Sequence, residues 1–115
     1  MAALVRIAHH LPVTAEDVVI THNPLATIPE LGIGGLSPNG YLVQPSVDPA
    51  HPDFWKALQV HLSRTLAHEL HHCARWRDPG YGSSLGETLV SEGLADRFDL
   101  EVHPGAPPYH WANAR

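Results

Sequence analysis

Apolar residues in the first half of the chain gather in short runs separated by turn-forming residues. Runs rich in β-branched residues at 4–8 and 17–21 predict short strands. Further on, the glycine-rich run 31–36 and the run 41–44 flank Asn39-Gly40. This dipeptide predicts a hairpin, because both central residues of a type I′ turn need positive φ. The first half therefore predicts a small β-sheet.

From Pro52 onward the apolar residues recur at spacings of three and four. Pro52 suits the first position of a helix, and Asp53 favours the positive end of its dipole. Turn-forming residues at 78–80 end the pattern. One helical face is predicted to carry an apolar stripe, made of Trp55, Leu58, Leu62, Leu66, Leu70 and Cys73. We therefore expect one long helix, with Cys73 as a core thiol.

A second helix is predicted to begin at Ser84 and to end near Leu100. Ser84 and Glu87 form a capping-box pattern. Both faces of this helix carry apolar residues, Leu85 and Leu89 on one and Val90, Leu94 and Phe98 on the other. Such a pattern predicts a buried helix.

Two carboxylates, Glu92 and Asp96, share the Leu85 face of this second helix. Burying an unpaired carboxylate is costly, so both side chains are expected to have a cation or a strong hydrogen-bond donor nearby. The alternative interpretation is that they are two surface acids on a half-exposed helix. The pair matters because the first helix offers a cation site.

The first helix contains His68-Glu69-Leu70-His71-His72, which matches the pattern H-E-x-x-H. Residues four apart face the same side of a helix, so His68 and His72 can bind one zinc ion (Zn²⁺). Glu69 lies about 100° round the helix, which places it beside the metal as a general base. Polar residues on a solvated helix face would give the same pattern by chance.

A catalytic zinc site needs three protein ligands and one open position. Glu92 is the preferred third ligand, with Asp96 accepting from the imidazole N–H of a ligand histidine. Asp78 is an alternative third ligand. The chain would have to turn at position 75 to bring Asp78 to the metal, and Arg75 stands where such a turn favours glycine. His103 and His110 are further alternatives.

The two helices together resemble the gluzincin metallopeptidases, which pair an HExxH helix with a downstream E-x-x-x-D helix. Here 19 residues separate His72 from Glu92, and Glu92 to Asp96 fit that form. In size, and in Gly-Ile-Gly-Gly-Leu at 32–36, the chain looks more like the minigluzincins and a family of predicted zinc-dependent proteases. The resemblance implies zinc ligands His68, His72 and Glu92, the base Glu69, and Asp96 behind a ligand histidine.

The same resemblance implies an α+β fold and a peptide substrate. The fold would be a small zincin-like domain, in which N-terminal strands of a short mixed sheet precede an active-site helix and a glutamate helix. Residues 33–36 would pair with an extended peptide, although two glycines can equally shape a bulge or loop. Tyr81, Tyr109 and His110 are candidates for stabilising the oxyanion. We expect a zinc metalloendopeptidase.

Composition narrows the remaining possibilities. The 115 residues suit one domain spanning 1–115, and a net charge of −5 argues against nucleic acid or anionic lipid as partners. No run is apolar enough for a membrane span or a signal peptide, so we expect a cytoplasmic protein, without excluding another secretion route. The alternative functions are a non-catalytic zinc-binding module and a regulatory interaction domain. The oligomeric state is not predicted.

Overall fold

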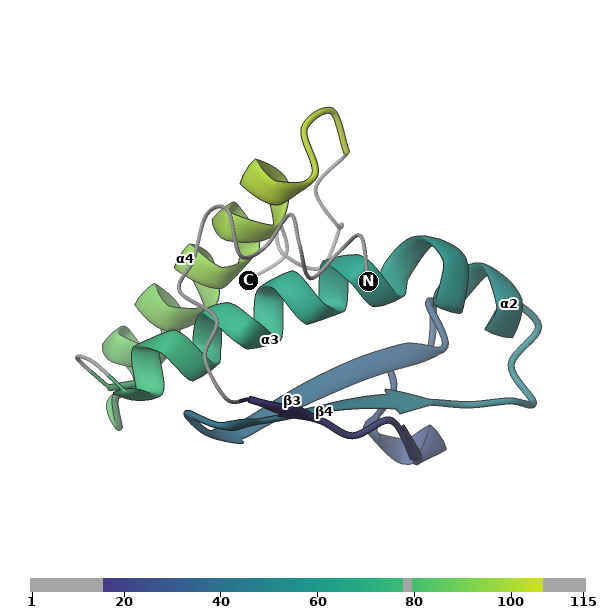
Figure 1. Cartoon of the computed structure of the whole chain (residues 1–115), viewed down its shortest axis with the longest axis horizontal. Coiled ribbons are helices and arrows are strands. Elements are labelled where there is room, and N and C mark those ends of the chain that lie inside the picture. Colours follow the sequence, from purple (N-terminus) through teal and green to yellow (C-terminus); the bar gives the residue numbers. More distant parts are fainter. Residues whose placement is uncertain (1–15, 78–79, 107–115) are drawn as a thin grey trace.

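The computed structural model describes residues 16–77 and 80–106, which form a small sheet covered on one face by two helices (Figure 1). The predicted α+β fold, with N-terminal strands followed by helices, is confirmed. In chain order the elements are β1 (Asp17–Val18), β2 (Thr21–His22), η1 (Pro24–Ala26), β3 (Ile33–Asn39), β4 (Leu42–Val47), α2 (Phe54–Lys56), η2 (Ala57–His61), α3 (Leu62–Arg77) and α4 (Leu85–Val102). The strand predicted at 4–8 lies outside the described residues.

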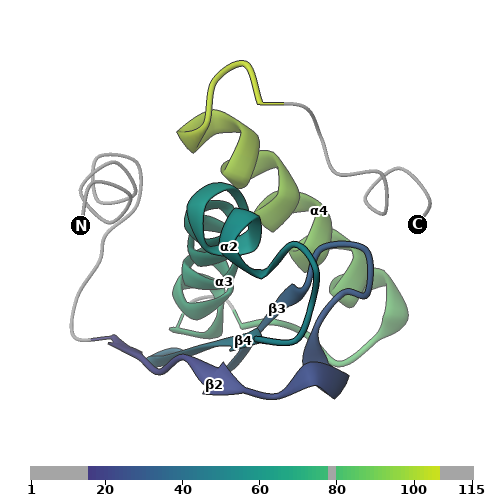
Figure 2. The ribbon, with the colours of Figure 1, turned by 90° about the vertical axis from the view of Figure 1, so that its right-hand side faces the viewer.

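Strand β4 forms the middle of the sheet. The run predicted as one strand at 17–21 is divided into β1 and β2, which both pair with β4 in parallel. On its other side β4 pairs antiparallel with β3, in a register that places Ile33 opposite Val47. Viewed from the side in Figure 2, α3 and α4 lie on the same side of this sheet. The sheet is mixed, as the sequence predicted.

The hairpin predicted at Asn39-Gly40 is present, but its turn is not of type I′. Among the described residues positive φ occurs only at Gly32, Gly80, Gly82 and Gly105. Gly40 is needed for a different reason, because a Cβ there would lie 2.6 Å from Cγ of Arg77. The side chain of Asn39 supports the turn by accepting a hydrogen bond from the backbone N–H of Tyr41 at 2.7 Å.

The long helix begins at Phe54 rather than at Pro52, and it contains a π-helical turn, η2, before α3. The wider turn rotates the residues before it relative to those after it, since five residues occupy the space of about four. Trp55 is consequently 71% exposed, and its predicted place in the buried stripe is wrong. The later part of the stripe is buried as expected, at Leu66, Leu70 and Cys73, against Val43 of β4 and Phe98 of α4.

Helix α4 begins with the predicted cap, in which the backbone N–H of Glu87 donates to the Ser84 hydroxyl at 3.1 Å. It packs by one face only, through Ser91, Ala95, Phe98, Asp99 and Val102. The prediction that both faces are buried is wrong, because Leu85, Leu89, Val90 and Leu94 are 39–78% exposed. The helix is apolar on a face that no described element covers. None of the helices described is long and apolar enough to cross a membrane.

A buried polar network joins α3 to α4. Arg64 and Asp99 form an ion pair of 2.7 Å, with both side chains almost fully buried. The ring of His103 bridges Asp99, at 3.1 Å from Nδ1 to Oδ1, and the hydroxyl of Ser63, at 2.9 Å from Nε2. His103 is therefore part of this network and not of the predicted metal site.

Candidate metal centre

The two histidines of the HExxH pattern lie one turn apart near the middle of α3. Helical geometry places His68 and His72 on the same face, and their Nε2 atoms are 3.0 Å apart. His72 is buried, whereas 18% of the His68 side chain is exposed. Both Nε2 atoms are therefore directed at one small region at the edge of the helix.

Glu92 enters this region from α4. Its Oε1 lies 3.3 Å from Nε2 of His68, and its Oε2 lies 2.9 Å from Nε2 of His72. The ligand atoms of the three residues are all within 4.8 Å of one another, and no other such group was found among the described residues. Two imidazole nitrogens and one carboxylate are the donor set of a catalytic zinc site. The residues present therefore fit a zinc ion.

The cluster is strongly coupled electrostatically. Burial alone would lower the pKa of His68, but hydrogen bonds to Asp96 and Glu92 outweigh it and raise this pKa to about 10. Burial would raise the pKa of Glu92, yet hydrogen bonds from His68, His72 and Tyr81 hold it well below its usual range. These hydrogen bonds therefore keep the Glu92 carboxylate ionised.

Asp96 lies behind His68, one turn after Glu92 on α4. Its Oδ1 is 3.0 Å from Nδ1 of His68, so the imidazole donates from Nδ1 and presents Nε2 to the cluster. The corresponding Nδ1 of His72 is buried and has no partner among the described residues. The two candidate ligand histidines are thus oriented differently, His68 by a carboxylate and His72 by packing.

Glu69 is placed by β3. Its carboxylate is buried, and Oε2 lies 4.0 Å from Nε2 of His68. The Ser37 hydroxyl is 2.8 Å from both Oε1 and the backbone O of Glu69, and it donates to one of them. On the other side, a Cβ added to Gly35 would lie 2.8 Å from Cγ of Glu69. The sequence indicated neither contact of Glu69, since both depend on how β3 packs against α3.

Comparison with protein families gives one match. Residues 17–114 match the model of a family described as predicted Zn-dependent protease (DUF2268). The chain belongs to this family. No curated protein and no solved structure shows significant similarity to it. The family description agrees with the donor set that His68, His72 and Glu92 bring together.

In this predicted Zn-dependent protease, Tyr81 also reaches the cluster. Its hydroxyl donates to Oε2 of Glu92 at 2.6 Å, and its ring lies 5.1 Å from that of His72. The other candidates for oxyanion stabilisation, Tyr109 and His110, lie outside the described residues, as does Asp78. Sequence spacing alone could not select Tyr81, because it precedes α4 in an irregular segment.

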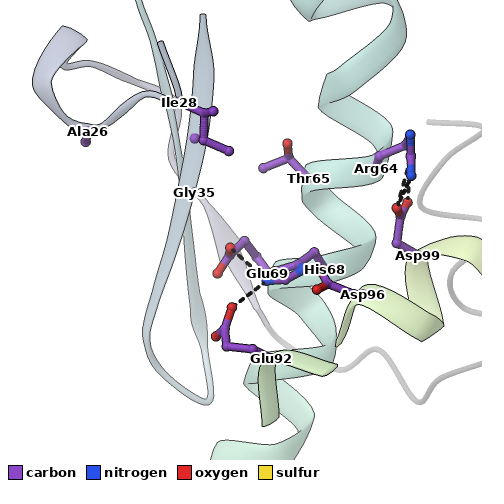
Figure 3. A pocket seen from close by; sticks show the side chains of 11 residues that line it. Ala26, Ile28, Gly35, Arg64, Thr65, His68, Glu69, Glu92, Asp96 and Asp99 are labelled. Carbon is purple, nitrogen blue, oxygen red and sulfur yellow. Dashed lines mark hydrogen bonds and ion pairs between the residues drawn. The ribbon is translucent and has the colours of Figure 1, made fainter. Parts of the chain in front are cut away.

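Two cavities meet at the candidate ligands. One, of about 190 Å³, extends past Ile28 and Thr65 to the Arg64–Asp99 ion pair (Figure 3). The other, of about 290 Å³, extends the opposite way to Trp76 and Tyr81. Both are lined by Gly35, Glu69 and Glu92, so the candidate metal centre lies where they join.

Proposed function

We propose that the chain is a zinc-dependent metalloendopeptidase of the gluzincin type, which hydrolyses peptide bonds with Glu69 as general base. The observation that carries this proposal is the convergence of His68, His72 and Glu92 beside the buried Glu69 carboxylate. Three protein ligands leave one coordination position open, as catalysis requires. The family description supports zinc and proteolysis in general terms.

Each residue of the candidate site has a separate role in the proposed reaction. A zinc ion held by His68, His72 and Glu92 would polarise the scissile carbonyl and lower the pKa of a bound water toward about 7. Glu69 would accept a proton from the attacking water and pass it to the departing nitrogen. Asp96 keeps the His68 ring in the orientation that binding requires.

Tyr81 is the residue we propose for stabilising the oxyanion. Its hydroxyl already donates to the Glu92 carboxylate, at the edge of the candidate metal centre. A donor placed there can turn to the carbonyl oxygen as negative charge develops on it. The ring contact with His72 limits how far the phenol can move.

The test is the substitution Glu69→Gln, which removes the base and adds no bulk. We expect the variant to keep one zinc ion per chain by elemental analysis and to lose cleavage of a fluorogenic peptide library. Glu101→Gln is the matched control, because Glu101 is exposed on α4 and forms an exposed ion pair with Arg97 at 3.5 Å. Full activity of Glu69→Gln would refute the assignment.

A non-catalytic interaction module is the second candidate function. The exposed apolar face of α4 favours it, because such faces commonly bind other proteins. Bound zinc without chelator-sensitive cleavage would support a zinc-binding module of this kind. Absence of zinc would support an interaction domain in which the HExxH pattern has no role.

A further inference from the structure

Apolar and aromatic residues contribute to the lining of the cavity on the Trp76 side of the candidate metal centre. We call Leu36, Trp76 and Tyr81 the aromatic pocket. The rings of Trp76 and Tyr81 stack with centroids 5.5 Å apart and planes at 21°. The indole Nε1–H donates to the backbone O of Ser37 at 2.7 Å, which fixes the ring in place. Trp76 and Leu36 remain 41% and 57% exposed, so the pocket is open to a ligand.

This pocket begins at the candidate metal centre itself. The Tyr81 ring separates the indole of Trp76 from the imidazole of His72, with which it makes an edge contact at 5.1 Å. Glu69 and Glu92 line the same cavity. A side chain bound against Trp76 therefore belongs to a residue next to the bond that is cut.

The relative direction of β3 and α3 shows which end of a substrate lies there. Gly35 packs against Thr65 and Glu69, whereas Gly40, just after the end of β3, packs against Cys73 and Arg77. The strand and the helix therefore run in the same direction. The aromatic pocket lies toward the carboxyl ends of both elements. The cavity lined by Thr65 lies toward their amino ends.

The outer edge of β3 offers one place for a peptide to pair. The backbone O of Ile33 accepts from Ile28 at 2.9 Å, and that of Ser37 accepts from Trp76. In an antiparallel strand alternate residues direct their N–H and C=O to the same edge, so Gly35 faces this edge between those two contacts. A peptide added antiparallel at Gly35 runs from Trp76 toward Thr65.

Building on the proposed peptidase function, we propose that the aromatic pocket holds a large apolar side chain on the N-terminal side of the scissile bond. Trp76 is the specificity-determining residue, since its indole is held by the Ser37 carbonyl, is 41% exposed and lines the pocket. Tyr81 connects the pocket to the reacting bond. The preference concerns the residue before the cut, because that residue lies over Trp76 in the antiparallel direction.

The experiment compares kcat/KM for fluorogenic peptides that differ only at the residue before or after the cut, with cleavage positions read by mass spectrometry. For the zinc-loaded wild-type protein we expect Phe or Leu before the cut to exceed Ser by at least about tenfold. Trp76→Ala should remove most of this preference and leave preferences after the cut unchanged. Trp55→Ala is the matched control, because Trp55 is exposed on α2 and lines neither cavity.

A second variant covers loss of folding in Trp76→Ala. Trp76→Phe keeps an aromatic ring at the same position and should reduce the same preference by a smaller factor. Absence of chelator-sensitive cleavage by the wild-type protein would refute both the peptidase function and this proposal. Cleavage without an apolar preference before the cut, or a preference that both variants keep or that lies after the cut, would refute the aromatic pocket alone.

Discussion

Replacing Gly35 by alanine should displace Glu69 and leave the three candidate zinc ligands in place. The added Cβ would lie 2.8 Å from Cγ of Glu69 and 2.9 Å from Cγ2 of Thr65, where ordinary contact begins at 3.4 Å. The Glu69 side chain or β3 must therefore move by about 0.6 Å. Displacements approaching about 1 Å in an active site cost on the order of 100-fold in rate. The overpacking itself costs about 1–3 kcal/mol of stability.

The assay for Gly35→Ala combines kcat/KM on a fluorogenic peptide, zinc content and urea denaturation. We expect a fall of about 10- to 100-fold in kcat/KM with one zinc ion retained. Gly93→Ala is the matched control, because a Cβ at this exposed position on α4 meets nothing within 4 Å. It should keep activity and gain roughly 0.5–1 kcal/mol of stability. Unchanged activity in Gly35→Ala would refute the placement of Glu69 by β3.

Three further predictions each concern a single residue. Asp96→Asn weakens the acceptor for Nδ1 of His68, 3.0 Å away, so zinc affinity measured by chelator competition should fall about 10- to 100-fold; an unchanged affinity would contradict the contact's role. Ser84→Ala removes the acceptor for the N–H of Glu87 and should cost about 1 kcal/mol in urea denaturation, and a cost near zero would contradict the cap. Burial raises the pKa of the Cys73 thiol, so a thiol reagent should label the native protein slowly and the unfolded protein rapidly. Equal labelling rates would contradict its burial in the core.

The sequence predicted the grouping of the candidate ligands because that grouping depends on helical geometry. His68 and His72 share a face through a four-residue spacing, which any regular helix imposes. Glu92 and Asp96 likewise lie one turn apart on α4, and each contacts the His68 ring. The grouping also requires the two helices to lie side by side. The apolar residues of both helices indicated that they pack together.

The contacts that complete the candidate site could not be predicted. Ser37 and Gly35 contact Glu69 because of the position at which β3 packs along α3. Tyr81 reaches Glu92 from an irregular segment, where no repeat fixes the direction of a side chain. Trp76 is four residues beyond His72, yet its role depends on a hydrogen bond to the backbone of β3.

Two of the failed fold predictions have different physical causes. A repeat of three and four residues assumes a uniform helix, so it cannot show the π-helical turn that exposes Trp55. The apolar residues of α4 show that a face would gain from burial, but they do not show that a partner exists. Leu85 and Leu89 are exposed because no described element lies over them.

The π-helical turn at Ala57–His61 also has a consequence for changes in chain length. Such a turn holds one more residue than an α-helical turn, so losing one residue there converts it to regular α-helix. The residues of α2 would then keep their orientation relative to α3, because the wider turn had absorbed the lost residue. Every residue after Leu62 would keep its place against β3 and α4. A single-residue deletion at this point is therefore taken up within the turn itself, and the geometry around His68 is preserved.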